Sequence, residues 1–431
     1  MTNIAPRLGI AYQLTPKTVV RMGYGRGYDL GVFGSVFGHN VTQNLPVLAI
    51  QTLNPANNFD SVFTLDKGPQ PLSAGSVLNS QPKGPNGRPL LPNGVTPFAL
   101  PNKLRLPTVD AWNFTIQRQI SNSMSLEVAF VGNKGTHVFA GDGGDYDSNQ
   151  ASIQGFGTLT TNQRKPFFQK FGWSQNLRYY GSDASNNYNG LQTKVEKRFG
   201  NGISLLSHYT WSKTLNYTNT YYNQDARLAY GVSNNSRAHV FLFTSLYELP
   251  FGKGKRFMGS ASRLTDFVLG GWQVNGIFSW MSGLTFTPSY RDCNSDRDTG
   301  WCRPDLVGDY SVNSPDQFGW FATTGTNNPL TTNGQTIGPW RRPQKGQFGS
   351  VGRNRLVGPN FSQLDTSFFK TFQVTERVNA QFRAEIFNLP NHTNLGQPNP
   401  CVDCPGIAGR IFATFPQYLP RQAQLALRFE F

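Results

Sequence analysis

The sequence predicts an all-β fold, namely a portion of an antiparallel, up-and-down transmembrane β-barrel with about eleven strands. Three observations predict it: the composition, an alternation of apolar and polar residues, and the order of short and long connections. The chain has 431 residues, of which 45 are glycine, 28 are proline and 13% are aromatic. A helical fold would contain fewer helix-breaking residues, and a disordered chain would contain fewer aromatic ones.

The strand signal is an alternation with a period of two residues. It is clearest in residues 421–431, where one face carries apolar side chains and the other carries Gln, Arg and Glu. The apolar set there is Ala423, Leu425, Leu427, Phe429 and Phe431. The same alternation recurs upstream to residues 4–14 and gives about eleven strands of about 11 residues each. Such strands reach about 36 Å at ~3.3 Å per residue, which suits a tilted membrane strand better than a soluble sandwich.

The connections between these strands alternate in length. Turns of a few residues follow the strands at 4–14, 109–120, 187–200 and 361–373, and a moderate linker at 250–269 follows the strand at 237–249. The other connections are long and polar: 28–108, 140–186, 216–236, 287–360 and 391–420. A barrel with tight periplasmic turns and long extracellular loops produces this order, because only one rim faces outward.

The number of predicted strands indicates that the chain forms only part of the wall of a barrel. Bacterial single-chain barrels have an even number of strands, and eleven is odd. A sheet with two free edges also invites aggregation. Residues 1–7 have neither the basic nor the apolar region of a signal peptide. We therefore expect residues 1–431 to be the C-terminal portion of a larger barrel, which lacks its N-terminal strands.

The charge and hydropathy of the chain argue against two classes of protein, namely helical membrane proteins and nucleic-acid-binding proteins. No apolar run approaches the ~18 residues of a membrane helix, and the mean hydropathy is −0.41. The net charge is +15, which raises the possibility of nucleic-acid binding. The Lys and Arg residues are scattered, however, and form no basic helix or zinc module. We assign them to a polar interior and to solvent-facing loops, so no nucleic-acid partner is expected.

The four cysteines form two close pairs, Cys293 with Cys302 and Cys401 with Cys404. Only the second pair has the Cys-x-x-Cys spacing of a zinc site, and no histidine lies nearby in metal-ligand register. Two local disulfides in an oxidising compartment are favoured over free thiols, and a metal site is the least favoured interpretation.

Two acidic loop segments are weak candidates for calcium, because their carboxylates are closely spaced. They are Asp142, Asp145 and Asp147, and Asp292, Asp296 and Asp298. Neither matches an EF-hand, so solvated loops are the alternative. No metal and no cofactor is otherwise expected. Aromatic residues near strand ends suit the girdle at the lipid headgroups, or else a ligand-binding vestibule; they are Tyr24, Tyr28, Tyr179, Tyr180, Trp211, Tyr217 and Trp280.

Several motifs together resemble TonB-dependent receptors of the Oar-like type. They are YNGLQTKVEKRF at 188–199, YTWSKTL at 209–215, RAHVF at 237–241 with YELPFGKG at 247–254, GWQVNGI at 271–277 and FRAEIFNLPNHTN at 382–394. The terminal RFEF, with Phe429 and Phe431, is similar to the signal that the barrel assembly machinery recognises. The resemblance spans about 109–431 and fits 1–27 more loosely. It implies a 22-stranded barrel, with a plug domain and a TonB-contacting segment that are not visible in this chain.

The resulting functional expectation is an outer-membrane receptor and transporter barrel in Gram-negative bacteria, which captures a ligand on its long loops. Its partners would be outer-membrane lipid, the barrel assembly machinery, an unknown ligand, and TonB only through the missing N-terminal region. No catalytic constellation stands out among the five dispersed histidines, so an enzyme is not expected. The alternatives are a plug-less pore or structural or adhesive barrel, and a secreted β-protein that binds glycans.

Overall fold

The structure is a computed structural model. It describes residues 3–29, 38, 42–44, 47, 53–69, 81–92, 95–103, 105–141, 144–218, 220–291, 302–323, 336–373, 375 and 378–431. None of the helices in these ranges has the length and apolar character needed to cross a bilayer.

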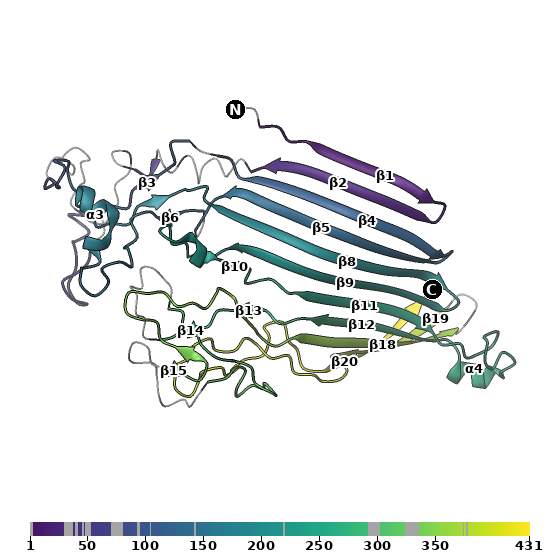
Figure 1. Cartoon of the computed structure of the whole chain (residues 1–431). Helices are drawn as coiled ribbons and strands as arrows, with labels where there is room; N and C mark the ends of the chain where they lie inside the picture. Colours follow the sequence, from purple (N-terminus) through teal and green to yellow (C-terminus); the bar gives the residue numbers. More distant parts are fainter. Residues whose placement is uncertain are drawn as a thin grey trace.

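One antiparallel sheet of twelve strands dominates the fold (Figure 1). Eleven of its strands follow one another in chain order, so each pairs with its neighbours in the sequence. They are β1 (Arg7–Thr15), β2 (Thr18–Tyr28), β4 (Thr108–Ser121), β5 (Met124–Val138), β8 (Ala184–Gly200), β9 (Ile203–Tyr217), β11 (His239–Glu248), β12 (Trp272–Met281), β18 (Phe361–Gln373), β19 (Asn379–Phe387) and β20 (Gln422–Glu430). The twelfth, β10 (Tyr230–Val232), pairs with the end of β9. The predicted all-β, up-and-down arrangement is confirmed.

The long and short connections lie at opposite ends of this sheet (Figure 1). Two-residue turns join β1 to β2, β4 to β5 and β8 to β9. At the last of these turns Asn201 and Gly202 have φ angles of 53° and 78°, which is the Asn-Gly chemistry of a tight hairpin turn. The short-turn rim is periplasmic and the long-loop rim extracellular.

The register places apolar side chains on one face of the sheet and polar ones on the other. One row across the sheet joins Phe130, Leu191, Trp211 and His239. Another row joins Gln117, Glu127, Lys194 and His208. Phe130 and Glu127 are three residues apart on β5, and successive strand residues point to opposite faces, so the two rows belong to different sides. The apolar face contacts lipid, and the polar face lines the interior.

One predicted strand is divided in the structure, and one predicted linker contains a helix. The segment 270–286 was expected as one strand, but β12 ends at Met281, and Thr285–Phe286 forms a separate strand, β13. Gly283 explains the break, because its Cα lies so near the Gly358 carbonyl that a Cβ could not be accommodated. The linker 250–269, in which no helix was expected, contains the helix α4 (Arg263–Leu269).

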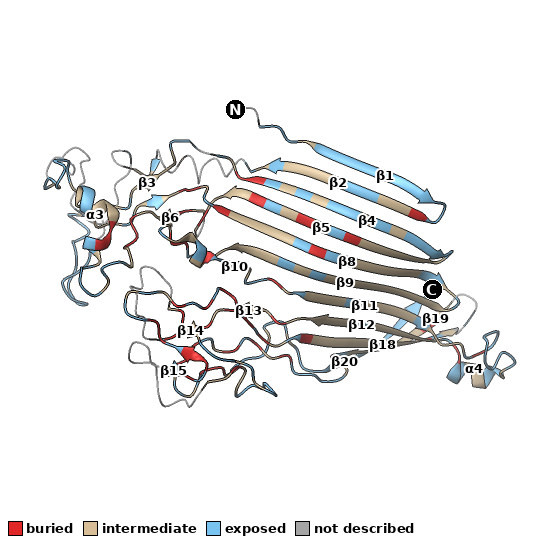
Figure 2. Ribbon diagram, in the orientation of Figure 1, coloured by how far each residue is buried: buried red, intermediate tan, exposed pale blue. Residues whose placement is uncertain are grey.

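Small elements occupy the extracellular connections. β3 (Phe98–Ala99), β6 (Tyr146–Asp147) and β7 (Arg178–Tyr179) form one sheet; β13 pairs with β17 (Leu356–Val357); and β14 (Asp305–Leu306), β15 (Thr336–Ile337) and β16 (Trp340–Arg341) form another. The helices in the described parts of these connections are η2 (Asn162–Arg164), α3 (Pro166–Phe171) and η3 (Ala226–Ala229). Many of the buried residues lie in this region, whereas β1 is exposed along its whole length (Figure 2).

Candidate functional site: the extracellular loop unit

The described parts of the connections 282–360 and 388–421 pack together around a hydrophobic core, which we call the loop core; these parts form the loop unit. Its buried residues are Phe286, Tyr290, Phe321, Ile337, Trp340, Val351, Leu356 and Val402. Trp340 at its centre is fully buried, donates from Nε1 to the Ala322 carbonyl at 2.8 Å and meets Phe321 edge-on at 5.8 Å. The loop core therefore gives these connections a defined surface.

A second buried cluster joins the connections after β5 and β9. Tyr221 and Tyr222 lie at its centre, with Tyr146 and Tyr217 packed against it. The rings of Tyr146 and Tyr221 are 4.8 Å apart, and the Tyr146 hydroxyl donates to Asp183 Oδ2 at 2.6 Å. Burial raises the pKa of Tyr221 to about 12. These phenols therefore stay neutral and serve as hydrogen-bond donors at neutral pH.

A cavity of about 470 Å³ lies between these connections, and two buried arginines, Arg303 and Arg353, line it. Arg353 donates to neutral oxygens of Asn216 and Asn234, at 2.7 to 3.0 Å, across a long stretch of sequence. Arg303 donates to the Leu228 carbonyl at 2.8 Å. Burial, together with the charge of Arg353, lowers the pKa of Arg303 to about 10, so Arg303 remains cationic at neutral pH.

Polar side chains complete the lining of this cavity. They are hydroxyls and amides, from Thr218, Asn234, Thr285, Thr287, Ser289 and Asn354. Such a cavity offers many hydrogen bonds and can orient a polar ligand. Arg353 reaches it because Gly231 lets the two backbones approach closely: a Cβ on Gly231 would lie 2.8 Å from Arg353 Cβ.

The structure gives the described calcium candidates other roles. Asp145 is buried and binds the Arg178 guanidinium, with Nε at 2.9 Å from Oδ1. Asp147 Oδ1 accepts from the backbone N–H groups of Asn149 and Leu177, at 2.8 and 2.9 Å. The other candidates, Asp142, Asp292, Asp296 and Asp298, lie outside the described residues. Calcium binding stays a prediction.

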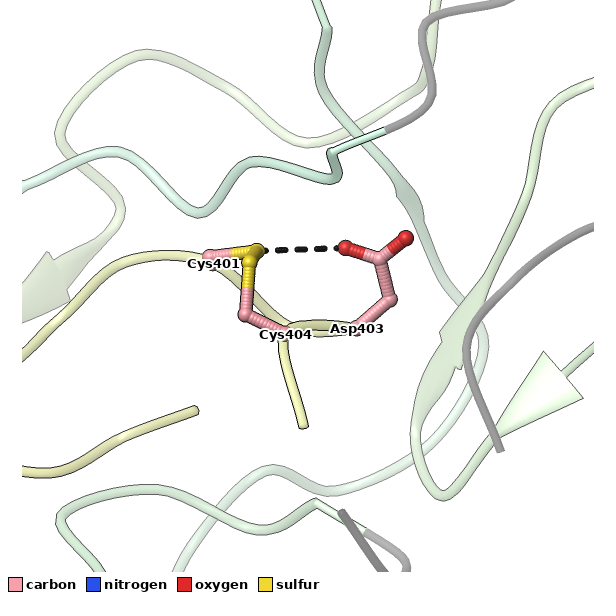
Figure 3. Close-up of side chains that lie close together, drawn as sticks. All are labelled: Cys401, Asp403 and Cys404. Carbon is pink, nitrogen blue, oxygen red and sulfur yellow. Dashed lines mark hydrogen bonds between the residues drawn. A yellow bond between two sulfur atoms is a disulfide. The ribbon is translucent and has the colours of Figure 1, made fainter. Parts of the chain in front are cut away.

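The Cys401–Cys404 pair is joined in a disulfide, with the Cα atoms 5.6 Å apart (Figure 3). Cys302 is also disulfide-bonded, and Cys293 lies outside the described residues. Asp403 is buried beside the first disulfide, and its Oδ1 lies 3.2 Å from Cys401 Sγ and accepts from the Arg291 N–H at 2.8 Å. A disulfide sulfur has no proton to donate, so the sulfur–oxygen approach is a packing contact.

These three residues are also the one group in the described part of the chain that resembles a metal site. The ligand atoms of Cys401, Asp403 and Cys404 all lie within 4.8 Å of one another. A thiolate is the form of cysteine that binds metal. Because the disulfide uses both sulfurs, the oxidised protein offers only one carboxylate there, which is too few ligands for a structural metal.

Four of the aromatic residues expected at the lipid headgroups fall into two groups. Trp211 and Trp280 lie on the apolar face near the extracellular rim, where both rings pack near His239, whose Nδ1 is 2.8 Å from the Tyr209 hydroxyl. The expectation is wrong for Tyr179 and Tyr180. Tyr179 pairs within the small loop sheet and Tyr180 is buried, so both belong to the loops.

The C-terminal residues keep the predicted alternation. Phe429 lies opposite Ala380 on the apolar face, and Phe431 is almost fully exposed. Arg428 and Glu430 on the polar face form an ion pair at 3.1 Å. The role of these phenylalanines in barrel assembly stays a prediction.

Sequence reasoning missed Arg303, Arg353 and Trp340. They lie in connections that have no periodic pattern, and their partners are far away in the sequence; Arg353 and Asn216 are 137 residues apart. The sequence offers one local sign that such a loop folds. Aromatic and arginine residues follow one another inside a connection that is otherwise rich in Gly and Pro.

The family comparison identifies the class of protein. Residues 1–424 match the family model described as outer membrane beta barrel domain. The chain belongs to this family, and its location is the bacterial outer membrane. A search of curated proteins finds no match.

Solved structures of outer-membrane receptors are similar at low identity. The outer membrane transporter YddB from Escherichia coli matches with a TM-score of 0.44 and 9% identity, over 99% of this chain and 40% of that one. The ferripyoverdine receptor of Pseudomonas aeruginosa matches with 0.43 and 9%, over 99% and 33%. The Ferric-Catecholate import receptor Fiu from E. coli K12 matches with 0.41 and 10%, over 98% and 34%. The chain thus spans between a third and two-fifths of their lengths.

Proposed function

We propose that this chain is the C-terminal portion of the barrel of a TonB-dependent receptor of the Oar-like type, which captures a ligand outside the cell for uptake. The observation that carries the proposal is the loop unit: the long connections lie at one rim and fold around their own core and a polar cavity. A barrel that binds no ligand needs no folded extracellular loops with a cavity. Catalysis is no part of this proposal, and the ligand stays unnamed.

The two edge strands of the sheet, β1 and β20, support the proposal that this chain forms only part of a barrel wall. No ladder joins β1 to β20 among the described strands. With eleven strands in the meander, both edge strands run from the extracellular rim to the periplasmic rim. Direct closure would pair them in parallel, whereas an odd number of additional strands would complete an antiparallel barrel. We propose that a further segment supplies these strands, and that a plug and a TonB-contacting segment accompany it.

The test of the receptor function compares uptake in cells with and without the gene. Radiolabelled ferric chelates, oligosaccharides and peptides serve as candidate substrates, each with and without an uncoupler of the proton gradient. We expect one substrate class whose uptake needs both the gene and the gradient. If uptake requires the gene but is unchanged by the uncoupler, the proposal is contradicted and a passive pore is favoured.

A bilayer experiment separates the receptor from the plug-less pore directly. The purified chain is added to planar lipid bilayers and the current is recorded. We expect no stable channel, because no described strand pairs with the outer edge of β1 or of β20. Reproducible single-channel steps from this chain alone would favour the alternative of a pore.

The C-terminal strand supplies the proposed contact with the barrel assembly machinery. In the folded sheet Phe431 is exposed and Phe429 lies on the lipid-facing side, so neither side chain is needed for a core within this chain. Deletion of Phe431 should reduce the amount of folded protein in the outer membrane, measured by heat-dependent mobility in gels. An unchanged folded fraction would exclude this role.

A further inference from the structure

The periplasmic connection between β11 and β12 has an unusual pattern of exposure. Its helix α4 exposes Leu264, Phe267 and Val268, which are 80%, 57% and 61% exposed. These residues have i, i+3, i+4 spacing and share one side of the helix. Asp266, on another side, accepts from the Lys253 N–H at 2.6 Å. The helix therefore directs Asp266 toward the rest of the connection and leaves most of the surface of Leu264, Phe267 and Val268 exposed.

Contacts place this helix against the lipid-facing side of the sheet. The Phe267 ring is 4.9 Å from Phe372, and the Trp272 Nε1 donates to the Val268 carbonyl at 2.9 Å. Phe372 belongs to the apolar face, where it lies opposite Ala380. Trp272 lies opposite Lys370, which is two residues from Phe372 on β18, so Trp272 points to the same face. The exposed apolar side of α4 thus continues the surface that contacts lipid, at the periplasmic rim (Figure 1).

Two further apolar side chains of the same connection are exposed. Phe251 and Phe257 are 41% and 48% exposed, and their rings lie 5.6 Å apart. The Arg256 guanidinium lies over the Phe257 ring at 5.5 Å. Aromatic rings beside basic groups are typical of segments that lie at the boundary between headgroups and acyl chains.

A cavity of about 670 Å³ lies between α4 and the end of β18. Lys253, Arg263 and Lys370 line it, with Asp266 as the acidic group of the lining. Lys370 is buried, and its Nζ donates to the Gly270 carbonyl. Three cations and one carboxylate leave an excess of positive charge, directly beside an apolar surface.

We propose that this connection binds an anionic phospholipid of the periplasmic leaflet, with the headgroup phosphate in the basic cavity and the acyl chains along Leu264, Phe267 and Val268. The charge of the cavity fits a phosphate, and the continuity of α4 with the apolar face fits the chains. The two observations point to the same ligand, because a phospholipid joins a phosphate to two acyl chains.

Native mass spectrometry of the detergent-purified chain tests the proposal. The probes are phosphatidylglycerol and phosphatidylcholine, which share their acyl chains but differ in net charge. We expect retention of phosphatidylglycerol to be stronger, and we expect the double variant Lys253→Gln/Arg263→Gln to reduce this preference roughly ten-fold. The matched control is Lys83→Gln/Arg88→Gln, two exposed residues of the extracellular connection, which should leave the preference unchanged.

Three outcomes would overturn the proposal. They are equal retention of the two lipids, an unchanged preference in the Lys253→Gln/Arg263→Gln variant, and displacement of the lipid by millimolar inorganic phosphate alone. The last outcome would indicate a site for a free anion instead of a lipid.

A spin label gives a second measurement that keeps the basic residues intact. A nitroxide at Leu264→Cys, in protein reconstituted into phosphatidylglycerol-containing vesicles, should be more accessible to oxygen than to a water-soluble nickel chelate. A label at Arg88→Cys should show the reverse. Equal behaviour of the two labels would place α4 in water and overturn the proposal.

Discussion

Apolar side chains are exposed on the wall, which is the twelve-stranded sheet, and are buried in the loop unit. In the wall, Leu425 and Leu427 are 73% and 58% exposed, whereas Trp340 in the loop unit is fully buried. The wall therefore has no core of its own on the lipid side, and its strands are held by their backbone ladders. The loop unit has a core like that of a soluble domain, built from aromatic and aliphatic side chains.

This difference shows that the wall is adapted to lipid as its surroundings, whereas the loop unit is adapted to water. In lipid, no hydrophobic driving force brings apolar side chains together, so the wall needs satisfied backbone groups and an apolar surface. In water, the same side chains must be removed from solvent, and connections long enough to do so form a core. A substitution should therefore have an effect that depends on which region contains it.

The largest expected effect is in the loop core. Trp340→Ala should destabilise the loop unit by about 3–5 kcal/mol, because it removes a fully buried indole and leaves a cavity. Limited proteolysis in increasing urea measures the unfolding of the loops. Heat-dependent gel mobility, which reports the sheet, should not change.

The control for Trp340 lies in the same connection. Phe318 is 64% exposed, so Phe318→Ala should change stability by less than about 0.5 kcal/mol. Equal effects of the two variants would show that the loop core does not stabilise the loops.

The second effect tests the two faces of the wall. Ile116 lies on the apolar face of β4, opposite Val20 and Val128. Ile116→Arg should destabilise the sheet by about 2–4 kcal/mol, because it places a charge near the middle of the bilayer. Urea unfolding in lipid vesicles, followed by tryptophan fluorescence, measures this loss.

Gln117, the next residue along β4, provides the matched control. It points to the polar face, opposite Glu127, so Gln117→Arg should be tolerated. A similar loss in both variants would mean that the assignment of the faces is wrong.

The sequence predicted the wall well and the loop unit poorly, for a physical reason. Alternation is a local property of a strand with one apolar face, and it located β18 and β20 within a residue or two of their ends. The loop core depends on contacts between distant residues, such as that of Phe286 with Phe321 or the hydrogen bond from Trp320 to the Val357 carbonyl. No period in the sequence encodes such contacts.

The third effect concerns the close approach that holds Arg353 in its cavity. Gly231→Ala should destabilise the loop unit by about 1–3 kcal/mol, because the new Cβ would lie 2.8 Å from Arg353 Cβ. A Cβ on Gly352 would meet no atom within 4 Å, so Gly352→Ala is the matched control. If both variants resist proteolysis equally, the approach of Arg353 to Gly231 does not limit the stability of this unit.

The smallest effect is a dependence on pH within the loop unit. Burial raises the pKa of Asp403 above that of an exposed carboxyl, so the folded loops retain a proton that the unfolded chain has lost. The resulting stabilisation is fully present below the ordinary carboxyl pKa and is lost as the pH rises through the folded value. Asp403→Asn should therefore reduce the loss of loop stability between pH 4 and pH 7, measured by limited proteolysis in urea.

Asp309 provides a control of opposite sign. Its carboxylate accepts from the Ser311 N–H at 2.9 Å, and hydrogen bonds with Ser311 lower its pKa. Its contribution to stability is present above the ordinary carboxyl pKa and is lost as the pH falls through the folded value. Asp309→Asn should therefore remove a small loss of stability toward acid pH. Identical pH profiles for the wild type and the Asp403 variant would show that this carboxyl is not desolvated, and that the loop core is wetter beside Cys401 than its packing indicates.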